Sequence, residues 1–466
     1  MSYYLSYDSK GNKVEKTEIE GRIKTIINGT DDDGNSFVSN DGVKVSGVSD
    51  DFGRTTKLLT SRGEGNSVYL SEYEYANGKS ANSTTNLVSK LTQRYGSNQI
   101  LKYEYSYDGN GNIMSITQNG TVVAKYKYDE LNQLSYAMDR NSGLFVEYNY
   151  DNAGNVTSVE EYGLSTTNWS PLSLKAEKTY TYGDTNWKDK MTSYNGENIT
   201  YDAMGNPLSY RDGMKMTWQN GRKLTSLKTN DNSITYKYDS NGLRTQKDDK
   251  NCTTCYYYDS KNNLIGIHYK LAPVLYFYYD SNGNVTSFSF NDTMYYYVKN
   301  LQGDVVKIID KSGREVVTYT YDAWGKILNQ TDSTIYNLAN LNPFKYRSYV
   351  YDNESGLYYL QNRYYDPVTG RFLNADDDTK HLKFTINVLC SNLYIYCCNN
   401  TVNFLDFDGC FPTLLIPGPY FIGMYDKGES LYLTMKMYLW SYSNRLPSGF
   451  VLYDFGGRYR TDFVYN

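Results

Sequence analysis

The sequence predicts an all-β chain in which tandem β-hairpins form one curved or spiral antiparallel sheet. Two observations lead to this prediction. A tyrosine–aspartate unit recurs along the chain, with Asp239, Asp259 and Asp280 at intervals of 20 and 21 residues, and tyrosine supplies 53 of the 466 residues. Tyrosine favours strands because its ring packs on a pleated surface while its hydroxyl reaches a polar partner or water.

The repeated unit has the pattern aromatic-x-Tyr-Asp-x-x-Gly-Asn-x-x-apolar. Aromatic-x-Tyr is the end of a strand with both rings on one face, because side chains alternate along a strand. Aspartate caps backbone amides and glycine takes a positive φ, so Asp-x-x-Gly is a turn and the following residues begin the return strand. The clearest copies are YSYDGNGNIMSI (105–116), YKYDELNQLSYA (126–137), YNYDNAGNVTSV (148–159), ITYDAMGNPLSY (199–210), YKYDSNGLRTQK (236–247), YYYDSKNNLIGI (256–267), FYYDSNGNVTSF (277–288) and YTYDAWGKILNQ (319–330).

Sugar-binding aromatics or calcium-binding aspartates at every turn are an alternative interpretation of the repeats. Packing and turn formation explain so many regularly spaced copies more economically, so we predict a structural role. The net charge of -5 gives no basic footprint for nucleic acid. No run of 18 apolar residues predicts a membrane span. The start, MSYYLSYDSKGNK, lacks the charged and apolar regions of a signal peptide, so the export route is open.

No metal or cofactor site is predicted. The one cysteine pair with motif spacing is Cys252-Thr-Thr-Cys255. A structural zinc site needs a second pair or histidines, and the chain has 2 histidines, His268 and His381. A surface disulfide or free thiols is therefore the preferred interpretation.

These units resemble the YD repeats, also called RHS repeats, of bacterial RHS toxins, the C component of insecticidal Tc toxins and the teneurin shell. The resemblance covers residues 95–410, with weaker copies in 1–94. It implies a β strip that spirals into a hollow shell around a C-terminal polypeptide. Because such shells usually contain more repeats, it also implies that this chain is the C-terminal part of a shell with an upstream portion as partner. The expected divisions are degenerate repeats (1–94), repeat shell (95–340), the RHS repeat-associated core (341–410) and a variable tail, either cargo or remnant (411–466).

Residues 341–410, which we call the core plug, begin with LNPFKYRSYVYDNESGLYYLQNRYYDPVTGRFL, similar to the RHS-associated core. In the family, this region ends in an intramolecular aspartyl protease that cuts after the leucine of Asp-Pro-x-Gly-Leu. Such chemistry requires one carboxylate as base and a second as acid. Carried onto this chain, the resemblance implies Asp376 as the leading catalytic residue, Arg371 as a residue that orients a carboxylate, and cleavage between Cys410 and Phe411. The candidate partners of Asp376 are Asp366, Asp377, Asp406 and Asp408.

The chain departs from the family pattern at four positions: Asp377, Thr401 and Phe407 replace prolines, and Cys410 replaces the final leucine. Two interpretations therefore stay open, an active self-cleaving site and a structural plug that has lost activity. No turnover enzyme is predicted beyond this autoprotease.

The resemblance implies a polymorphic toxin shell that encloses the C-terminal tail, 411–466, in competition between bacteria. A cognate immunity protein is an expected partner, and the expected location is secreted or at a bacterial cell surface. A cell-surface adhesin or carbohydrate-binding protein without catalytic activity is the main alternative. An inactive remnant that serves as a recombination cassette is a third.

Overall fold

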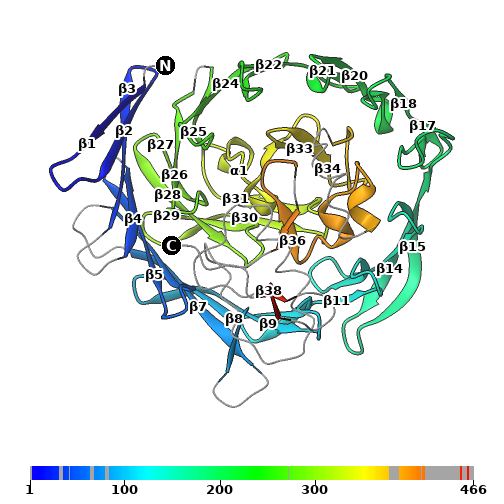
Figure 1. The fold of residues 1–466 in the computed structure, drawn as a ribbon, viewed down its shortest axis with the longest axis horizontal. Coiled ribbons are helices and arrows are strands. Elements are labelled where there is room, and N and C mark those ends of the chain that lie inside the picture. Colours follow the sequence, from blue (N-terminus) through cyan, green and yellow to red (C-terminus); the bar gives the residue numbers. More distant parts are fainter. Residues whose placement is uncertain are drawn as a thin grey trace. The chain divides into compact units, whose positions relative to one another are not determined.

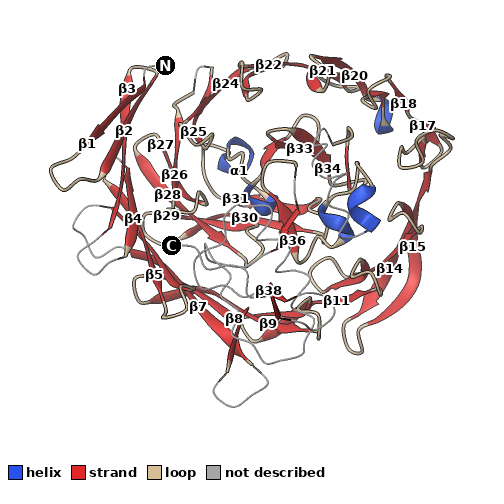
Figure 2. Ribbon diagram, viewed as in Figure 1, coloured by secondary structure: helices blue, strands red, loops and turns tan. Residues whose placement is uncertain are grey.

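The computed structural model describes residues 3–30, 35–40, 42–62, 68–78, 83–270, 272–376, 388–410, 412–414, 452–453 and 459–460. The chain divides into two compact units, Met1–Met424 and Tyr425–Asn466. The predicted all-β fold class is confirmed: in the described residues strands dominate, and the α-helix is the single short turn α1 (Leu338–Leu341) (Figure 2).

The first unit begins with a 17-stranded sheet in which each strand pairs antiparallel with the next strand in the sequence. This succession of neighbours is what tandem hairpins produce. Its strands are β1 (Tyr3–Tyr7), β2 (Lys13–Ile19), β3 (Arg22–Thr30), β4 (Ser36–Asn40), β5 (Val43–Ser49), β6 (Thr55–Arg62), β7 (Val68–Asn77), β8 (Thr84–Tyr95), β9 (Asn98–Tyr107), β10 (Ile113–Gln118), β11 (Thr121–Tyr128), β12 (Leu134–Asp139), β13 (Leu144–Tyr150), β14 (Val156–Ser165), β15 (Ser170–Thr181), β16 (Ser193–Tyr194) and β17 (Glu197–Asn198).

A 14-stranded sheet follows with the same connectivity. In the part of the chain that the structure describes, neither sheet closes into a barrel. The strands of this second sheet are β18 (Thr200–Tyr201), β19 (Pro207–Ser209), β20 (Lys215–Gln219), β21 (Lys223–Lys228), β22 (Ser233–Tyr238), β23 (Arg244–Asp248), β24 (Thr253–Tyr258), β25 (Leu264–Tyr269), β26 (Leu275–Tyr279), β27 (Val285–Phe290), β28 (Thr293–Lys299), β29 (Val305–Asp310), β30 (Glu315–Tyr321) and β31 (Ile327–Asp332).

The turns have the chemistry that the repeat predicts. In the turn that begins at Asp108, the carboxylate Oδ1 accepts the backbone N–H groups of Asn110 and Asn112 at 2.9 and 2.8 Å. Its Oδ2 accepts the side-chain amide of Asn112 at 3.0 Å, and Gly111 has a φ of 83°. Each hairpin therefore turns through a network made within five residues, which explains why local sequence specifies it. The same side-chain network forms at Asp8, Asp129, Asp151, Asp202, Asp259 and Asp280.

Most of the tyrosines that end a strand just before a turn have their own hydrogen-bond partner. The Tyr107 hydroxyl donates to the carbonyl of Val88, and the Tyr128 hydroxyl donates to that of Ile113, at 2.6 and 2.7 Å. Because the acceptor belongs to the preceding hairpin, each of these bonds joins one repeat to the one before it. A buried hydroxyl needs such a partner, so phenylalanine would pack there but leave the carbonyl without its bond. The same bond forms from Tyr150, Tyr182, Tyr201, Tyr238, Tyr258, Tyr279 and Tyr321.

The strip of strands overlaps itself, so that β25–β29 lie inside β2–β9 (Figure 1). Lys24 is fully buried at this overlap and donates to the carbonyl oxygens of Ile265 and Phe277 at 3.3 and 2.5 Å. Farther along, the Gln93 side chain donates to the carbonyl of Lys299 at 2.6 Å. The two large sheets of the first unit therefore follow one another along a spiral strip (Figure 1), as the sequence predicts for the tandem hairpins.

The core plug lies inside the curve of the strip (Figure 1). It contains a four-stranded antiparallel sheet and a two-stranded hairpin among its described residues. Its elements are η2 (Tyr346–Ser348), β32 (Val350–Asp352), β33 (Leu357–Leu360), β34 (Arg363–Asp366), β35 (Arg371–Phe372), η4 (Val388–Ser391), η5 (Cys397–Asn399) and β36 (Phe404–Asp406), with β37 (Pro412–Leu414) following it; η1 (Arg211–Gly213) belongs to the shell.

Buried ion pairs fix the core plug to the shell. The guanidinium of Arg244 binds both oxygens of Asp352, at 2.5 and 3.0 Å, and both side chains are at most 1% exposed. Arg211 binds Asp366 in the same two-pronged way, at 2.7 and 2.8 Å. In both pairs the arginine comes from the shell and the aspartate from the core plug.

The core plug also forms hydrogen bonds with the side-chain amides of successive shell turns. The side-chain amides of Asn400, Asn399 and Asn392 donate to three turn residues of the shell that occupy one repeat position. This register explains the Asn-rich sequence of residues 392–403. The pairs are Asn400–Asn112 at 3.0 Å, Asn399–Gln133 at 2.8 Å and Asn392–Asn155 at 2.8 Å.

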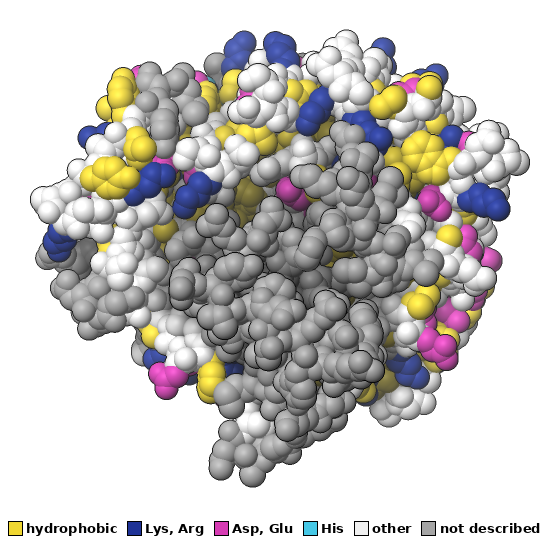
Figure 3. All heavy atoms as spheres, viewed as in Figure 1, with side chains coloured by type: hydrophobic (Ala, Val, Ile, Leu, Met, Phe, Trp, Pro, Cys, Tyr) yellow, Lys and Arg dark blue, Asp and Glu magenta, His cyan; other side chains and the backbone are white. Residues whose placement is uncertain are grey.

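The remaining findings concern the surface, the cysteines and the second unit. On the face drawn in Figure 3, Lys and Arg side chains of the described residues are scattered among neutral and acidic ones. No helix of the described ranges is long and apolar enough to cross a bilayer.

Cys255 lies on β24 and Cys252 directly precedes this strand. Both are free thiols, so the disulfide is not formed. His381 lies outside the described residues. In the second unit, β38 (Leu452–Tyr453) pairs antiparallel with β39 (Tyr459–Arg460).

Candidate active site

The predicted cleavage position falls in the turn of the β36–β37 hairpin. Asp406 pairs with Pro412 across this hairpin, so Cys410 lies in the short turn that joins the two strands. Phe411, on the other side of the predicted cut, lies outside the described residues. A peptide bond in a turn is accessible to a hydrolytic group because no partner strand covers it.

Asp406 holds the backbone immediately before the predicted cut. Its Oδ1 accepts the N–H groups of Gly409 and Cys410 at 2.9 and 3.0 Å, and its own N–H donates to the Tyr349 hydroxyl at 2.7 Å. Gly409 has a φ of 78°, and a Cβ there would lie 2.9 Å from the carbonyl oxygen of Leu360. Glycine is therefore required at this position for conformational and steric reasons.

Arg363, on β34, joins two of the predicted carboxylates. Its Nη2 lies 2.9 Å from Oδ2 of Asp376 and 3.5 Å from Oδ2 of Asp406. Its other donors bind the carbonyl oxygens of Leu393, at 3.0 Å, and Gly409. The three side chains are between 1% and 9% exposed. The arginine thus places two carboxylates and the turn backbone around one buried point.

Burial raises the pKa of Asp406 to about 7, and the neighbouring charges of Asp408 and Asp376 add to this effect while Arg363 opposes it. A carboxyl with such a pKa holds its proton in a large fraction of molecules at neutral pH. Burial also raises the pKa of the Cys410 thiol to about 12, so this thiol is not a thiolate nucleophile near neutrality. Asp406 and Asp376 therefore place a carboxylic acid and a second carboxyl group beside one turn. These are the two groups that acid–base hydrolysis of a peptide bond requires.

The teneurin YD-shell family model matches residues 74–402, which is more than half of the chain. The chain belongs to the teneurin YD-shell family.

Two curated relatives of this YD-shell chain are nucleases of Bacillus. It is 36% identical over 237 residues to the tRNA3(Ser)-specific nuclease WapA of Bacillus spizizenii and 34% identical over 247 residues to the tRNA nuclease WapA of Bacillus subtilis strain 168. In both cases the match covers 50% of this chain and 10% of the relative.

Among solved structures, the Tc holotoxin pore of Photorhabdus luminescens has the same fold over 88% of this chain and 21% of that chain, with a TM-score of 0.65 at 19% identity. The likeness therefore extends over most of the described shell and core plug.

The other predicted partners of Asp376 do not share its contact with Arg363 in the described residues. Asp366 is held by Arg211, and Asp377 lies outside the described residues. Asp408 is exposed, and its carboxylate accepts the N–H of Cys410 at 3.1 Å. Of the four candidate partners of Asp376, Asp406 is the one that shares an arginine with it in the described residues.

Arg371 binds neither Asp376 nor Asp406 in any described hydrogen bond or ion pair. Its Nη2 donates to the carbonyl of Asp189 at 2.9 Å and to Asn392 at 3.2 Å. The arginine at the carboxylates is Arg363, which the sequence analysis did not single out. Its signal was a single cation inside an aromatic strand, a residue type that is rarely buried without a charged partner.

Proposed function

We propose that this chain is the closing part of a polymorphic-toxin shell whose core plug cuts the polypeptide between Cys410 and Phe411. The observation that carries the proposal is the placement of Asp376 and Asp406 on one buried arginine, next to the turn that contains Cys410. Family membership and the fold shared with the Tc holotoxin support the shell role.

In the proposed reaction Asp376 is the base and Asp406 is the acid. Asp376 takes a proton from a water molecule, whose oxygen adds to the carbonyl carbon of Cys410. Asp406 gives its proton to the nitrogen of Phe411, and the C–N bond breaks. The products are a carboxylate on Cys410 and a new amino terminus on Phe411. Arg363 holds both carboxyl groups in place and limits the repulsion between them.

Two departures from the family pattern leave the two carboxyl groups in place. Phe407, at one lost proline, is 53% exposed in the hairpin turn. Thr401, at another, is buried and donates its hydroxyl to the carbonyl of Ala323 at 2.6 Å. Arg363 still holds Asp376 and Asp406 despite these replacements. The retained contacts favour an active site over a lost one.

The shell role implies an enclosed cargo, 411–466, that stays inside after cleavage. The resemblance to RHS toxins implies that the cargo is a toxin, that the shell is secreted or displayed at a bacterial surface, and that a cognate immunity protein protects the producer. The two WapA relatives are tRNA nucleases. An upstream shell portion completes the enclosure. This use belongs to competition between bacteria.

A native and a denaturing separation of the purified chain test both parts of the proposal. Under native size-exclusion conditions the wild type is expected to elute as one species, whereas a denaturing gel separates a shell fragment from a small fragment. Asp406→Asn should give one full-length band in the gel. A single wild-type band would contradict cleavage, and loss of the small fragment from the native peak would contradict enclosure.

The rate of cleavage is expected to fall as pH rises through about 7. Burial raises the pKa of Asp406 to about 7, so its proton is present below that pH and is lost above it. Each further pH unit should then slow the reaction about tenfold, because the acid form is required. Refolding from urea at a series of pH values, with samples quenched over time, gives the rates. A rate that rises with pH through this range would exclude Asp406 as the acid.

A carbohydrate-binding role is a second candidate, favoured by one observation. Tyr136, Phe145 and Tyr162 lie on three successive strands with ring centroids 5.3 and 6.1 Å apart, and none is fully buried. The hydroxyl of Tyr136 donates to Glu147, and that of Tyr162 donates to Glu160. Aromatic faces beside carboxylates suit stacking on sugars. A glycan array that shows saturable binding, lost in Phe145→Ala, would support this role, and an array without signal would exclude it.

A further inference from the structure

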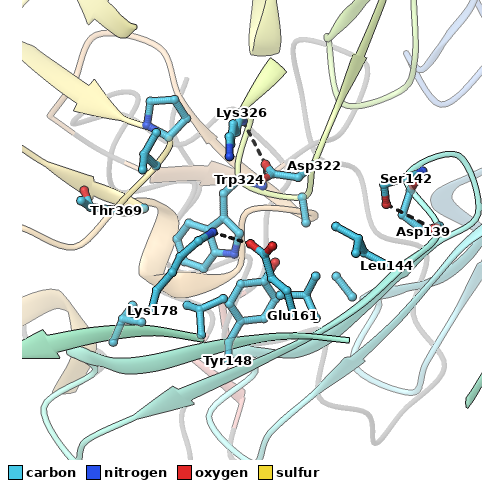
Figure 4. Close-up of a pocket in the computed structure, with 18 of the residues that line it drawn as sticks. Asp139, Ser142, Leu144, Tyr148, Glu161, Lys178, Asp322, Trp324, Lys326 and Thr369 are labelled. Carbon is cyan, nitrogen blue, oxygen red and sulfur yellow. Dashed lines mark hydrogen bonds and ion pairs between the residues drawn. The ribbon is translucent and has the colours of Figure 1, made fainter. Parts of the chain in front are cut away.

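A cavity of about 130 Å³ lies between β12–β15 of the shell and two turns, at 322–328 and 367–370 (Figure 4). Its lining includes the apolar side chains of Leu144, Val146 and Val159 as well as charged side chains. None of the residues proposed for self-cleavage lines this cavity, so it is a separate feature of the core plug and shell.

Asp322 departs from the repeat pattern at this cavity. In seven other turns the residue four positions after the aspartate is an asparagine or a glutamine whose amide donates to Oδ2, as Asn284 does to Asp280 at 3.0 Å. At Asp322 that position is Lys326, and the two described hydrogen bonds, from the N–H groups of Trp324 and Lys326, both reach Oδ1 at 2.9 Å. The turn therefore leaves Oδ2 of a cavity-lining carboxylate without the amide that caps it elsewhere.

Trp324 supplies a donor at the same place. Trp324 is 4% exposed, and its indole Nε1 has no hydrogen-bond partner in the described residues. The ring packs against Tyr148, with centroids 5.6 Å apart, and lies among the residues that line the cavity (Figure 4). Buried N–H groups are nearly always paired in folded proteins, so this donor indicates a site that an acceptor completes.

The charges around the cavity favour a cation. Glu161 and Lys178 neutralise each other at 2.6 Å, which leaves Asp139 and Asp322 against the exposed Lys326. Burial raises the pKa of Asp322 to about 6 and raises that of Asp139 as well. At Asp322 the charges of Lys178 and Lys326 oppose this effect of burial only in part.

We propose that this cavity binds a small aliphatic ammonium compound that also carries a carboxylate or carbonyl oxygen. The ammonium group pairs with Asp322, the oxygen accepts the N–H of Trp324, and the hydrocarbon part lies on Val146, Val159 and Leu144. A lysine-like amino acid has this combination of groups. The binding role is independent of the proposed self-cleavage.

Isothermal titration calorimetry of the full chain with three probes tests the assignment. The first probe, 6-aminohexanoate, carries both groups, whereas 1-aminohexane lacks the oxygen and hexanoate lacks the ammonium. We expect 6-aminohexanoate to bind about tenfold more tightly than 1-aminohexane, with hexanoate weaker still, because a hydrogen bond to a charged group contributes about that factor or more. Equal affinities for the three probes, or no saturable binding of 6-aminohexanoate, would overturn the proposal.

Lys326→Asn is the decisive variant, because it restores the amide that caps Oδ2 in other repeats. Lys326→Met removes the same positive charge without adding the amide, so we expect Lys326→Asn to bind 6-aminohexanoate about tenfold or more weakly than Lys326→Met, with no lower melting temperature. Arg314→Asn makes the same change at the neighbouring turn, outside the cavity, and should leave binding unchanged. Trp324→Phe keeps an aromatic side chain without the N–H and should remove the preference for 6-aminohexanoate over 1-aminohexane. Equal binding by Lys326→Asn and Lys326→Met would contradict the site.

Discussion

Replacing Arg244 with methionine is expected to lower the free energy of unfolding by about 3–5 kcal/mol, because it leaves Asp352 buried without its main partner. Both side chains are at most 1% exposed, and the guanidinium binds both carboxylate oxygens. Lys247, whose Nζ lies 3.3 Å from Asp352, softens the loss but offers only one contact. The pair joins a shell strand to the core plug, so its loss should loosen the plug.

Urea unfolding followed by tryptophan fluorescence measures this effect. The matched control is Arg314→Met, since Arg314 also pairs with an aspartate, Asp310, at 2.7 Å but with its own side chain 78% exposed. Surface pairs of this kind contribute about 0–1 kcal/mol, so the control should unfold close to the wild type. Equal destabilisation by the two variants would show that the buried pair does not anchor the core plug.

Replacing Arg363 with methionine is expected to slow self-cleavage about 10²–10³-fold, the cost of removing a preorganised charged donor from a reaction centre. Arg363 contacts Asp376, Asp406 and the Gly409 carbonyl at once. It also lowers the pKa of Asp406 against the effect of burial. Without it the pKa should rise further, so the fall in rate should shift to higher pH.

Refolding kinetics over a pH series measure both effects. Arg371→Met is the control, because Arg371 is a buried arginine of the same core plug that binds the Asp189 carbonyl instead of the two carboxylates. It should cost stability yet keep the wild-type pH profile, and Arg363→Lys should recover part of the rate. A normal rate in Arg363→Met, or an equal loss of rate in Arg371→Met, would show that Arg363 has no specific role in cleavage.

The hairpins could be predicted from the sequence because their determinants are local. The turn at Asp108 is complete within five residues, and its tyrosine reaches only the preceding hairpin. The particular contacts that the strip makes where it overlaps itself could not be predicted, since Lys24 and the carbonyl of Ile265 that it binds are 241 residues apart. A lysine that becomes buried by such a distant contact cannot be told from a solvent-exposed lysine in the sequence.

The candidate site was predictable only in part. The positions of Asp376 and Asp406 followed from the resemblance to the RHS-associated core. The arginine did not, because Arg371 and Arg363 both stand next to aromatic residues in short strands, and only the packing of the core plug decides which one faces the carboxylates. The sequence has Lys326 where most repeats have an amide residue, but the cavity beside Asp322 was not predicted and required the structure.

Intact-mass spectrometry of the denatured wild type beside Asp376→Asn tests the central claim most directly. The account predicts that the wild type gives two masses that sum to the full chain plus one water, with the small fragment beginning at Phe411. Asp376→Asn should give the single uncut mass. One uncut mass from both chains would contradict self-cleavage, and the core plug would then be a structural closure of the shell alone.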